Sequence, residues 1–245
     1  MKMNLWSITD IGAVRKQNQD FCRTEVLPDG QMLLIACDGM GGARAGNVAS
    51  ELTAQTFGDV MLEGLSDSER SADIKQLLVE AVTAANHAVW HRSGTDPDCL
   101  GMGTTLVAAY ISNGMCQVVN VGDSRAYIIT DEGIRRVTRD HSLVEDLVQS
   151  GEITPEQART HPQKNLITRA MGAAPDTKAD LFEEPCVEGG YLLLCTDGLS
   201  NLVTDQEILY EVIHGGAQED CCKRLLDTAL QRGAPDNVTV ILLRM

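Results

Sequence analysis

Five aspartates stand beside apolar, strand-like segments, and they are the residues of this chain best suited to chemistry. Asp38 and Asp197 each follow an apolar run and precede a glycine, in "LLIACDGMGG" and "YLLLCTDGLS". Asp123 lies between two apolar runs, Asp236 immediately precedes one, and Asp20 lies in the N-terminal "RKQNQDF". Strand ends on one side of a sheet share a surface, so we expect these carboxylates to converge. Converging carboxylates repel one another, and either some hold protons or cations bind between them.

Oxygen ligands favour hard cations when no histidine or cysteine ligand stands nearby. The candidates are Mg²⁺, Mn²⁺ or Ca²⁺ rather than Zn²⁺, and the sequence contains no EF-hand spacing. A carboxylate shared by two ions, with water in the remaining positions, is typical of binuclear hydrolytic centres, whose ions lie about 3.5–4 Å apart. The competing interpretation of any single Asp-Gly pair is a tight turn after a strand. It is the recurrence of the pattern that favours a metal site.

Arg15 supplies a candidate substrate contact. It lies five residues before Asp20, in "DIGAVRKQNQD". A guanidinium group beside metal ions suits a phosphate oxyanion, which it binds with two parallel hydrogen bonds. The alternative is a surface arginine paired with an acidic neighbour.

The composition excludes several classes of function. The 245 residues are 43% hydrophobic and 22% charged, which is typical of a globular protein, and the formal net charge is −15. Such an acidic chain is unsuited to nucleic acid or an anionic membrane. The N-terminus shows no signal peptide and no apolar run is long enough to span a bilayer, so we expect a cytoplasmic protein. Eight cysteines without a C-x-x-C pair favour reduced thiols.

Strand and helix patterns alternate in groups along the chain. Helical periodicity appears at Val48–Val60 and Ile74–Val89, and again near Ile208–Ile213 and Cys222–Ala229. Asn113-Gly114 indicates a hairpin. Grouped strands with helix pairs between them favour an α+β fold with two packed antiparallel sheets and helices outside. Residues 140–172 predict a small helical flap, with Thr154-Pro155-Glu156 opening a helix. The strand-like runs are Leu5–Ile8, Gln31–Cys37, Thr104–Ile111, Met115–Val121, Ala126–Thr130, Tyr191–Cys195 and Val238–Leu243.

Eight motifs in order resemble the bacterial branch of the metal-dependent type 2C serine/threonine protein phosphatases. The resemblance extends from about Trp6 to Leu243. The motifs are "TDIGAVRKQNQD", "CDGMGG", "GMGTTLVAAYI", "VVNVGDSRAYII", "TRDHSLV", "HPQKNLITRAMG", "LLLCTDGLSNLV" and "APDNVTVILL". Each is weak alone, but eight in the expected order make chance resemblance implausible.

The resemblance implies a fold and a set of partners. The family fold is a four-layer α-β-β-α sandwich, two antiparallel sheets flanked by helix pairs, so residues 1–245 would form one catalytic domain with its flap at about 140–172. The substrates would be phosphoserine and phosphothreonine proteins, the substrates of an opposing serine/threonine kinase. No nucleic acid or membrane partner is implied, and the family is usually monomeric.

The resemblance also assigns roles to the aspartates. Asp38 would bridge two Mn²⁺ or Mg²⁺ ions, with the backbone carbonyl of Gly39 on one of them. Asp123 and Asp197 would hold a third ion, and Arg15 would grip the phosphate. A metal-activated water would attack phosphorus in line and displace the Ser or Thr oxygen. Asp20, Asp197 and Asp236 would complete the binuclear set, directly or through water.

Three positions depart from the family pattern. Many bacterial members carry a histidine and a glutamate where this chain has Ala43 and Asn47, and Met40 stands where animal members have the proposed acid. The remaining candidates to protonate the leaving oxygen are a metal-bound water and two histidines of the flap, His141 and His161. The alternative function is a non-catalytic phosphoprotein-binding module on the same fold. Such a module should have lost metal carboxylates, and this chain has kept them.

Overall fold

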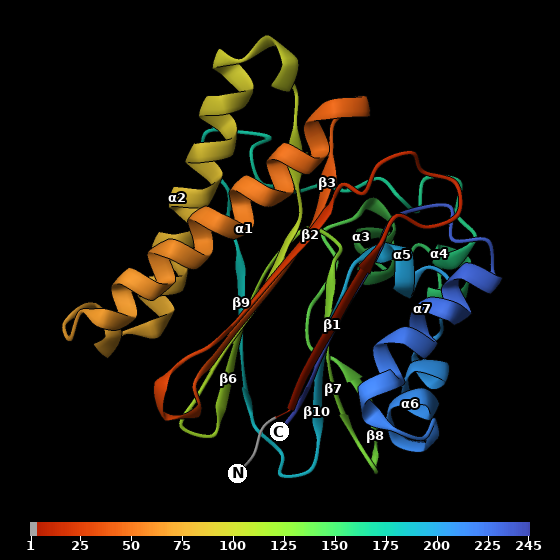
Figure 1. Cartoon of the computed structure of the whole chain (residues 1–245). Coiled ribbons are helices and arrows are strands. Elements are labelled where there is room, and N and C mark those ends of the chain that lie inside the picture. Colours follow the sequence, from red (N-terminus) through yellow and green to blue (C-terminus); the bar gives the residue numbers. More distant parts are fainter. Residues whose placement is uncertain (1–3) are drawn as a thin grey trace.

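Two stacked antiparallel sheets with helices on both outer faces form the fold (Figure 1). The computed structural model describes residues 4–245, and the side chains of all of these except Asp29 and residues 42–44. Within that range no helix is long and apolar enough to cross a membrane. All eight cysteines are free thiols.

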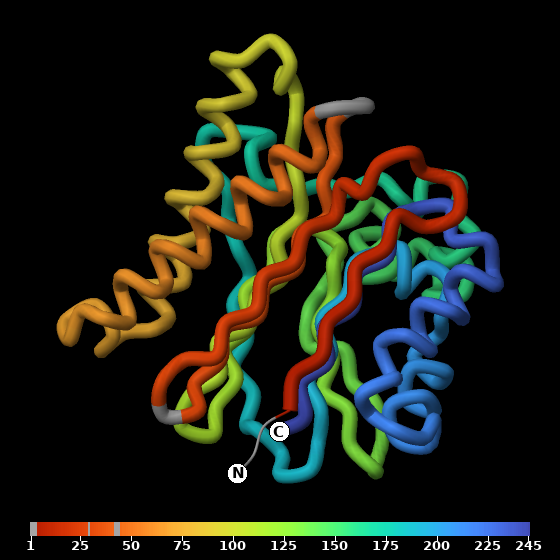
Figure 2. Tube along the Cα trace, in the orientation of Figure 1, coloured from red at the N-terminus to blue at the C-terminus, as the bar shows by residue number. Residues whose placement is uncertain are grey.

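The first sheet joins the two ends of the chain. β1 at its edge pairs with β11 from Asn4↔Arg244 to Asp10↔Val238, and Figure 2 shows these two terminal strands running side by side. In spatial order its strands are β1 (Asn4–Asp10), β11 (Val238–Arg244), β10 (Tyr191–Cys195), β7 (Arg125–Thr130) and β8 (Gly133–Arg136). Its outer face is covered by α6 (Asp205–His214) and α7 (Cys221–Gln231), and the short α5 (Asp197–Ser200) follows β10 directly.

The second sheet carries the other helix pair. In spatial order its strands are β2 (Asp20–Val26), β3 (Met32–Met40), β5 (Leu106–Ser112), β6 (Met115–Val121) and β9 (Asp180–Pro185), and β4 (Gly103–Thr104) pairs with the end of β3. The long helices α1 (Gly42–Ser66) and α2 (Ile74–Thr95) cover its outer face.

Alternating side chains along the central strands build three apolar layers. In β3, Leu33 and Ile35 pack toward α1 and α2, whereas Leu34 and Ala36 pack between the two sheets. All four are fully buried. Because successive strand residues point to opposite faces, a strand buried on both sides must be apolar throughout. This explains the unbroken apolar run that precedes Asp38.

The predicted α+β sandwich is confirmed, and all seven predicted strands are present. The Asn113-Gly114 hairpin is confirmed too, since both residues have the positive φ that such a turn needs. Four strands were not predicted: β2, β8 and β9, and the short β4, of which only Thr104 fell within a predicted run. β2, β8 and β9 each lie at the edge of a sheet. Edge strands carry polar and charged side chains, which conceal the apolar alternation that identifies a strand.

The buried face of α1 differs from the predicted one by one position. The predicted stripe at Val48, Leu52, Thr56 and Val60 is only partly buried. The fully buried stripe begins one residue later, and its smaller members let the helix approach the sheet closely. It comprises Ala49, Thr53, Ala54, Phe57 and Met61.

Residues 140–172 form a helical insertion between β8 and β9. It contains α3 (Leu143–Gln149) and α4 (Pro155–Arg159). The predicted start of α4 is confirmed, because Thr154 and Gln157 form a reciprocal capping box. The two ends of the insertion are joined by a bridge between Ser142 and Ile167. Figure 1 shows α3 and α4 beside α5.

Candidate metal centre

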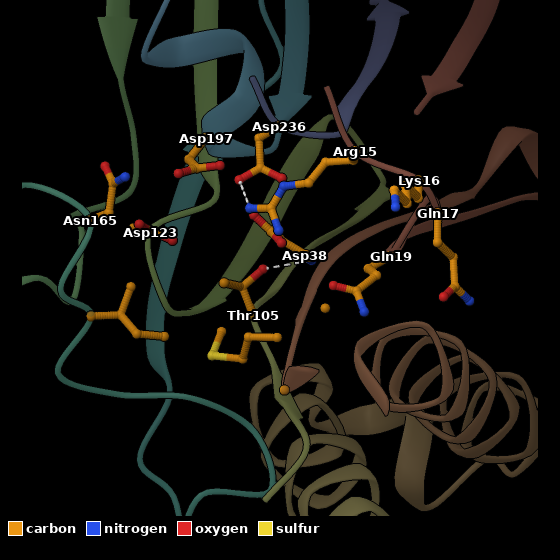
Figure 3. Close-up of a pocket in the computed structure, with 14 residues that line it drawn as sticks. Arg15, Lys16, Gln17, Gln19, Asp38, Thr105, Asp123, Asn165, Asp197 and Asp236 are labelled. Carbon is orange, nitrogen blue, oxygen red and sulfur yellow. Dashed lines mark hydrogen bonds and ion pairs between the residues drawn. The ribbon is translucent and has the colours of Figure 1, made fainter. Parts of the chain in front are cut away.

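A pocket of about 460 Å³ gathers most of the predicted site residues. Asp38, Asp123, Asp197 and Asp236 line it, together with Arg15. Gly39 also lines the pocket. Figure 3 shows the four carboxylates around the open centre of the pocket, with the Arg15 guanidinium between Asp236 and Asp38.

Each of these aspartates comes from a different element. Asp197 begins α5 directly after β10, and Asp236 lies just before β11, the neighbour of β10 in the first sheet. Asp123 lies in the turn between β6 and β7. Asp38 lies within β3 rather than after it, because the strand continues to Met40 by pairing with β4. The centre therefore depends on both sheets.

Asp20 is the one predicted metal ligand that does not line the pocket. It begins β2 and stands directly opposite Asp38 in the strand register. Its Oδ2 accepts hydrogen bonds from the hydroxyls of Thr196, at 2.8 Å, and Thr239, at 2.7 Å. Its Oδ1 is buried without a hydrogen-bond partner. Asp20 thus lies outside the pocket lined by the other four aspartates. One of its carboxylate oxygens is hydrogen-bonded to two threonines, and the other has no hydrogen-bond partner.

Burial and mutual repulsion raise the pKa values of aspartates in and behind the pocket. Burial raises the pKa of Asp38 well above its usual range, and the charges of Asp20 and Asp197 raise it further. Burial is also the main cause that raises the pKa of Asp20 to about 7 and that of Asp123 to about 8. The pKa of Asp197 is raised by burial and then by the charge of Asp236. Without cations, the cluster therefore holds protons near neutral pH.

These residues fit a hard divalent cation. Four carboxylates line the pocket, and carboxylate oxygens are ligands that Mg²⁺ and Mn²⁺ prefer. Asp20 and Asp197 each have one buried oxygen without a hydrogen-bond partner, which a cation or its water would satisfy. Among the described residues, no group of three or more His, Cys, Asp or Glu side chains is already arranged so that it could hold a metal ion. The fit therefore rests on charge and unsatisfied oxygens.

The raised pKa values predict how pH affects stability. Asp20 and Asp123 titrate near pH 7 and 8 when folded, far above the ordinary 3.8 of an aspartate. Over this range the folded chain binds more protons than the unfolded chain, so the metal-free protein loses stability as pH rises. A pKa that differs by one between the folded and unfolded chain changes the free energy of unfolding by about 1.4 kcal/mol. We expect the unfolding temperature in EDTA to fall by about 2–4 °C per kcal/mol lost between pH 7 and pH 8.

Added Mn²⁺ should reverse this loss, because the cation replaces the protons. Its stabilising effect in thermal unfolding should therefore be larger at pH 8 than at pH 7, where protons still compete. Asp123→Asn is the control, since it removes one titrating carboxyl and should flatten the pH dependence. A metal-free protein that becomes more stable over this range would contradict the prediction.

Arg15 is held at the rim by the cluster itself. Its Nη2 donates to Asp236 Oδ2 at 2.6 Å, and its side chain is 49% exposed. Asp236 thus orients the guanidinium while leaving other N–H groups toward the pocket. Lys16, Gln17 and Gln19 follow in the same segment and also line the pocket. Sequence reasoning missed them, although their position between Arg15 and Asp20 was a usable signal.

A hydroxyl network that sequence reasoning also missed fixes the backbone of Asp38. Its N–H donates to Thr105 Oγ1 at 2.9 Å, and its carbonyl accepts from Thr104 Oγ1 at 2.8 Å. Thr105 Oγ1 is in turn 2.7 Å from Ser124 Oγ, the residue after Asp123. Figure 3 shows the Thr105 contact beneath Asp38. The network links the two segments that carry Asp38 and Asp123.

The helical insertion contributes Asn165 and Ile167 to the pocket wall. Neither histidine proposed as an acid lines the pocket. His141 is buried, and burial is the main cause that lowers its pKa. His161 accepts a hydrogen bond from the N–H of Gln163 within the insertion. Of the departing positions, Met40 lines the pocket, Asn47 does not, and the side chain of Ala43 lies outside the described residues.

Comparisons with known proteins agree with this geometry. The family model described as Protein phosphatase 2C matches residues 13–233. The chain is 36% identical over 236 residues to the serine/threonine phosphatase stp of Listeria monocytogenes, covering 96% of this chain and 92% of that protein.

Solved structures show the same fold. The serine/threonine phosphatase of S. agalactiae superposes with a TM-score of 0.91 at 35% identity, covering 100% of both chains. The catalytic domain of the phosphatase PstP, solved in complex with 2 manganese ions, superposes with a TM-score of 0.83 at 35% identity. That superposition covers 99% of this chain and 97% of that domain.

Proposed function

The chain belongs to the protein phosphatase 2C family and is a metal-dependent serine/threonine protein phosphatase, and we propose that its reaction takes place in the Asp38 pocket with two Mn²⁺ or Mg²⁺ ions. The observation that carries this proposal is the meeting of four aspartates from four separate segments around one pocket. When bound, the ions would activate a water for attack on phosphorus and neutralise the charge that develops there.

Asp38 is the proposed bridge between the two ions, with the backbone carbonyl of Gly39 as a further ligand. A side chain at Gly39 would overlap the backbone carbonyls of Gly46 and Gln19, so this position requires glycine. Asp197 and Asp236 complete the set from the opposite sheet. Asp20 would act through water, because its Oδ1 is buried without a hydrogen-bond partner and Asp20 does not line the pocket.

Arg15 is the proposed phosphate ligand. Its ion pair with Asp236 presents the guanidinium to the pocket, where two N–H groups can bind two phosphate oxygens. Lys16 lies on the same rim and adds positive charge for a dianionic substrate. These cations, with the bound ions, would make the acidic pocket receptive to phosphate.

Direct attack by water is favoured over an intermediate phosphorylated on serine, cysteine or histidine. Among the described residues that line the pocket there is no serine, cysteine or histidine. The hydroxyl of Thr105 is occupied by the Asp38 N–H and by Ser124. With no histidine at hand, we infer that the leaving serine or threonine oxygen takes its proton from water in the pocket.

The finer assignments extend this proposal. Asp123, together with Asp197, is the proposed ligand of a third ion on the side that faces the helical insertion. Residues 1–245 act as one catalytic domain with the insertion as its flap, because the site draws on segments from Arg15 to Asp236. The opposing partner is a serine/threonine kinase, since its products are the substrates, and we expect the chain to act as a monomer.

The test is phosphate release from a phosphothreonine peptide by metal-free protein as Mn²⁺ is added. We expect turnover that depends on Mn²⁺ or Mg²⁺ and disappears in EDTA. A protein that binds Mn²⁺ yet releases no phosphate from phosphothreonine, phosphoserine or an aryl phosphate would contradict the proposal. The non-catalytic binding module on the same fold would then be favoured.

A further inference from the structure

The turn that carries Asp123 is attached to the helical insertion through one buried histidine. Gly122 precedes Asp123, and its N–H donates to Nδ1 of His141 at 3.0 Å. In the opposite direction, the backbone N–H of His141 donates to the carbonyl of Gly122 at 2.9 Å. The His141 side chain is 5% exposed. The two residues are thus joined by a pair of hydrogen bonds out of reach of bulk water.

Gly122 is also packed closely against Thr105 and hydrogen-bonded to Asn120. Its φ is +109°, and a side chain there would meet Thr105. Its carbonyl also accepts from Asn120 Nδ2 at 3.1 Å. A shift of His141 would therefore displace the backbone next to Asp123 rather than be absorbed by the turn.

The far side of the His141 ring faces the segment that leaves the insertion. Nε2 lies 3.2 Å from Asp180 Oδ2 and 2.9 Å from Arg169 Nη1. The two protons of Arg169 Nη1 are directed at Lys178 O, at 2.9 Å, and Asp180 Oδ1, at 3.0 Å. Nε2 therefore carries the ring proton and donates to Asp180, which leaves Nδ1 free to accept from Gly122. Asp180 selects the tautomer that holds the turn.

His141 also ties the two ends of the insertion together. Its carbonyl accepts the N–H of Thr168 at 2.8 Å, and the neighbouring Ser142 bridges to Ile167. Ile167 lines the pocket. The same residue thus contacts the start of the insertion, its end and the turn before Asp123.

We propose that His141 is a positioning residue that holds Asp123 in place through Gly122 and so couples the affinity of the ion at Asp123 to the placement of the helical insertion. This inference rests on the proposed function, in which Asp123 is a metal ligand. His141 does not line the pocket and acts only through its neighbours. Movement of the insertion on substrate binding would reach Asp123 by this route.

Two substitutions of similar size separate this role from simple packing. In His141→Asn the amide oxygen takes the place of Nδ1 and keeps the bond from Gly122. In His141→Gln the amide reaches the place of Nε2 and the Gly122 N–H loses its acceptor. Calorimetric titration of metal-free protein with Mn²⁺ gives the affinity of each ion, and Asp123→Asn identifies the binding step that belongs to Asp123.

We expect His141→Gln to weaken that step by about tenfold or more, the usual effect of removing a group that orients a metal ligand. His141→Asn should remain near wild type. Wild-type affinity in His141→Gln, or equal losses in both variants, would overturn the inference and leave the proposed function intact. Failure of the proposed function is a separate result: Asp38→Asn would then bind Mn²⁺ as wild type does.

A measurement on the wild type guards against variants that fail to fold. In ¹⁵N-labelled metal-free protein, His141 Nδ1 and the Gly122 amide are followed by NMR as diamagnetic Mg²⁺ is added. Both resonances should shift in the step that Asp123→Asn abolishes. Resonances that stay fixed while that step is completed would overturn the inference.

Discussion

Asp38→Asn should reduce phosphatase activity by on the order of 10³ or more and at the same time raise the stability of the metal-free protein. The amide keeps the shape of the side chain but removes the charge proposed to hold two ions. Metal stabilisation of a phosphoryl transition state is worth several kcal/mol, and each 1.4 kcal/mol is about tenfold in rate. The stability gain follows because burial and the charges of Asp20 and Asp197 penalise ionised Asp38.

The two effects are measured as phosphate release at saturating Mn²⁺ and as thermal unfolding in EDTA. Asp131→Asn is the matched control, because Asp131 is exposed in the turn between β7 and β8. It loses the same charge from the chain without touching the pocket, so both readings should match wild type. A variant that keeps a tenth of the activity, or that loses stability when metal-free, would show that Asp38 is not the crowded bridging carboxylate.

The sequence predicted those parts of the site that lie next to strongly apolar strands. Asp38, Asp197 and Asp236 adjoin β3, β10 and β11, which are buried on both faces and therefore easy to recognise. The sandwich followed from the same signal, because long buried strands in hairpin order leave few other arrangements. The core strands and the site aspartates could be predicted together because these aspartates lie at or next to the core strands.

Other features depend on tertiary contacts that no local pattern records. The depth of Asp20 follows from the pairing of β2 with β3 and from two threonines more than 170 positions away along the chain. Thr105 is a strand residue by pattern, and only the fold places its hydroxyl under Asp38. His141 was a candidate acid because neither usual motif position carries a histidine and His141 lies in the predicted flap. Its burial, and with it its different role, depends on contacts with Gly122 and Asp180.

The glycine after Asp197 is required by the close approach of two backbone segments. We therefore expect Gly198→Ala to have a large effect on both stability and metal affinity. Gly198 follows Asp197 in α5, and a Cβ there would overlap the backbone carbonyl oxygen of Asn237, which follows Asp236. The new methyl group would meet a backbone atom, which cannot rotate away as a flexible side chain can. The segments that carry Gly198 and Asn237, α5 and the start of β11, must therefore move apart. Overpacking of this kind costs about 1–3 kcal/mol and occasionally more.

The same movement separates Asp197 from Asp236, so Gly198→Ala should lose both stability and metal affinity. We expect the unfolding temperature to fall by about 2–4 °C for each kcal/mol of unfolding free energy lost. We expect the Mn²⁺ concentration needed for half-maximal activity to rise by about 10–100-fold, as when a group that orients metal ligands is lost. Gly94→Ala is the matched control: Gly94 is exposed in α2 with nothing near its Cβ position, so alanine there should be neutral or stabilising. If Gly198→Ala behaves like Gly94→Ala in both measurements, the close approach of these two backbones does not set the distance between the two carboxylates. If it loses stability but keeps its Mn²⁺ affinity, Asp197 and Asp236 do not hold the ions together.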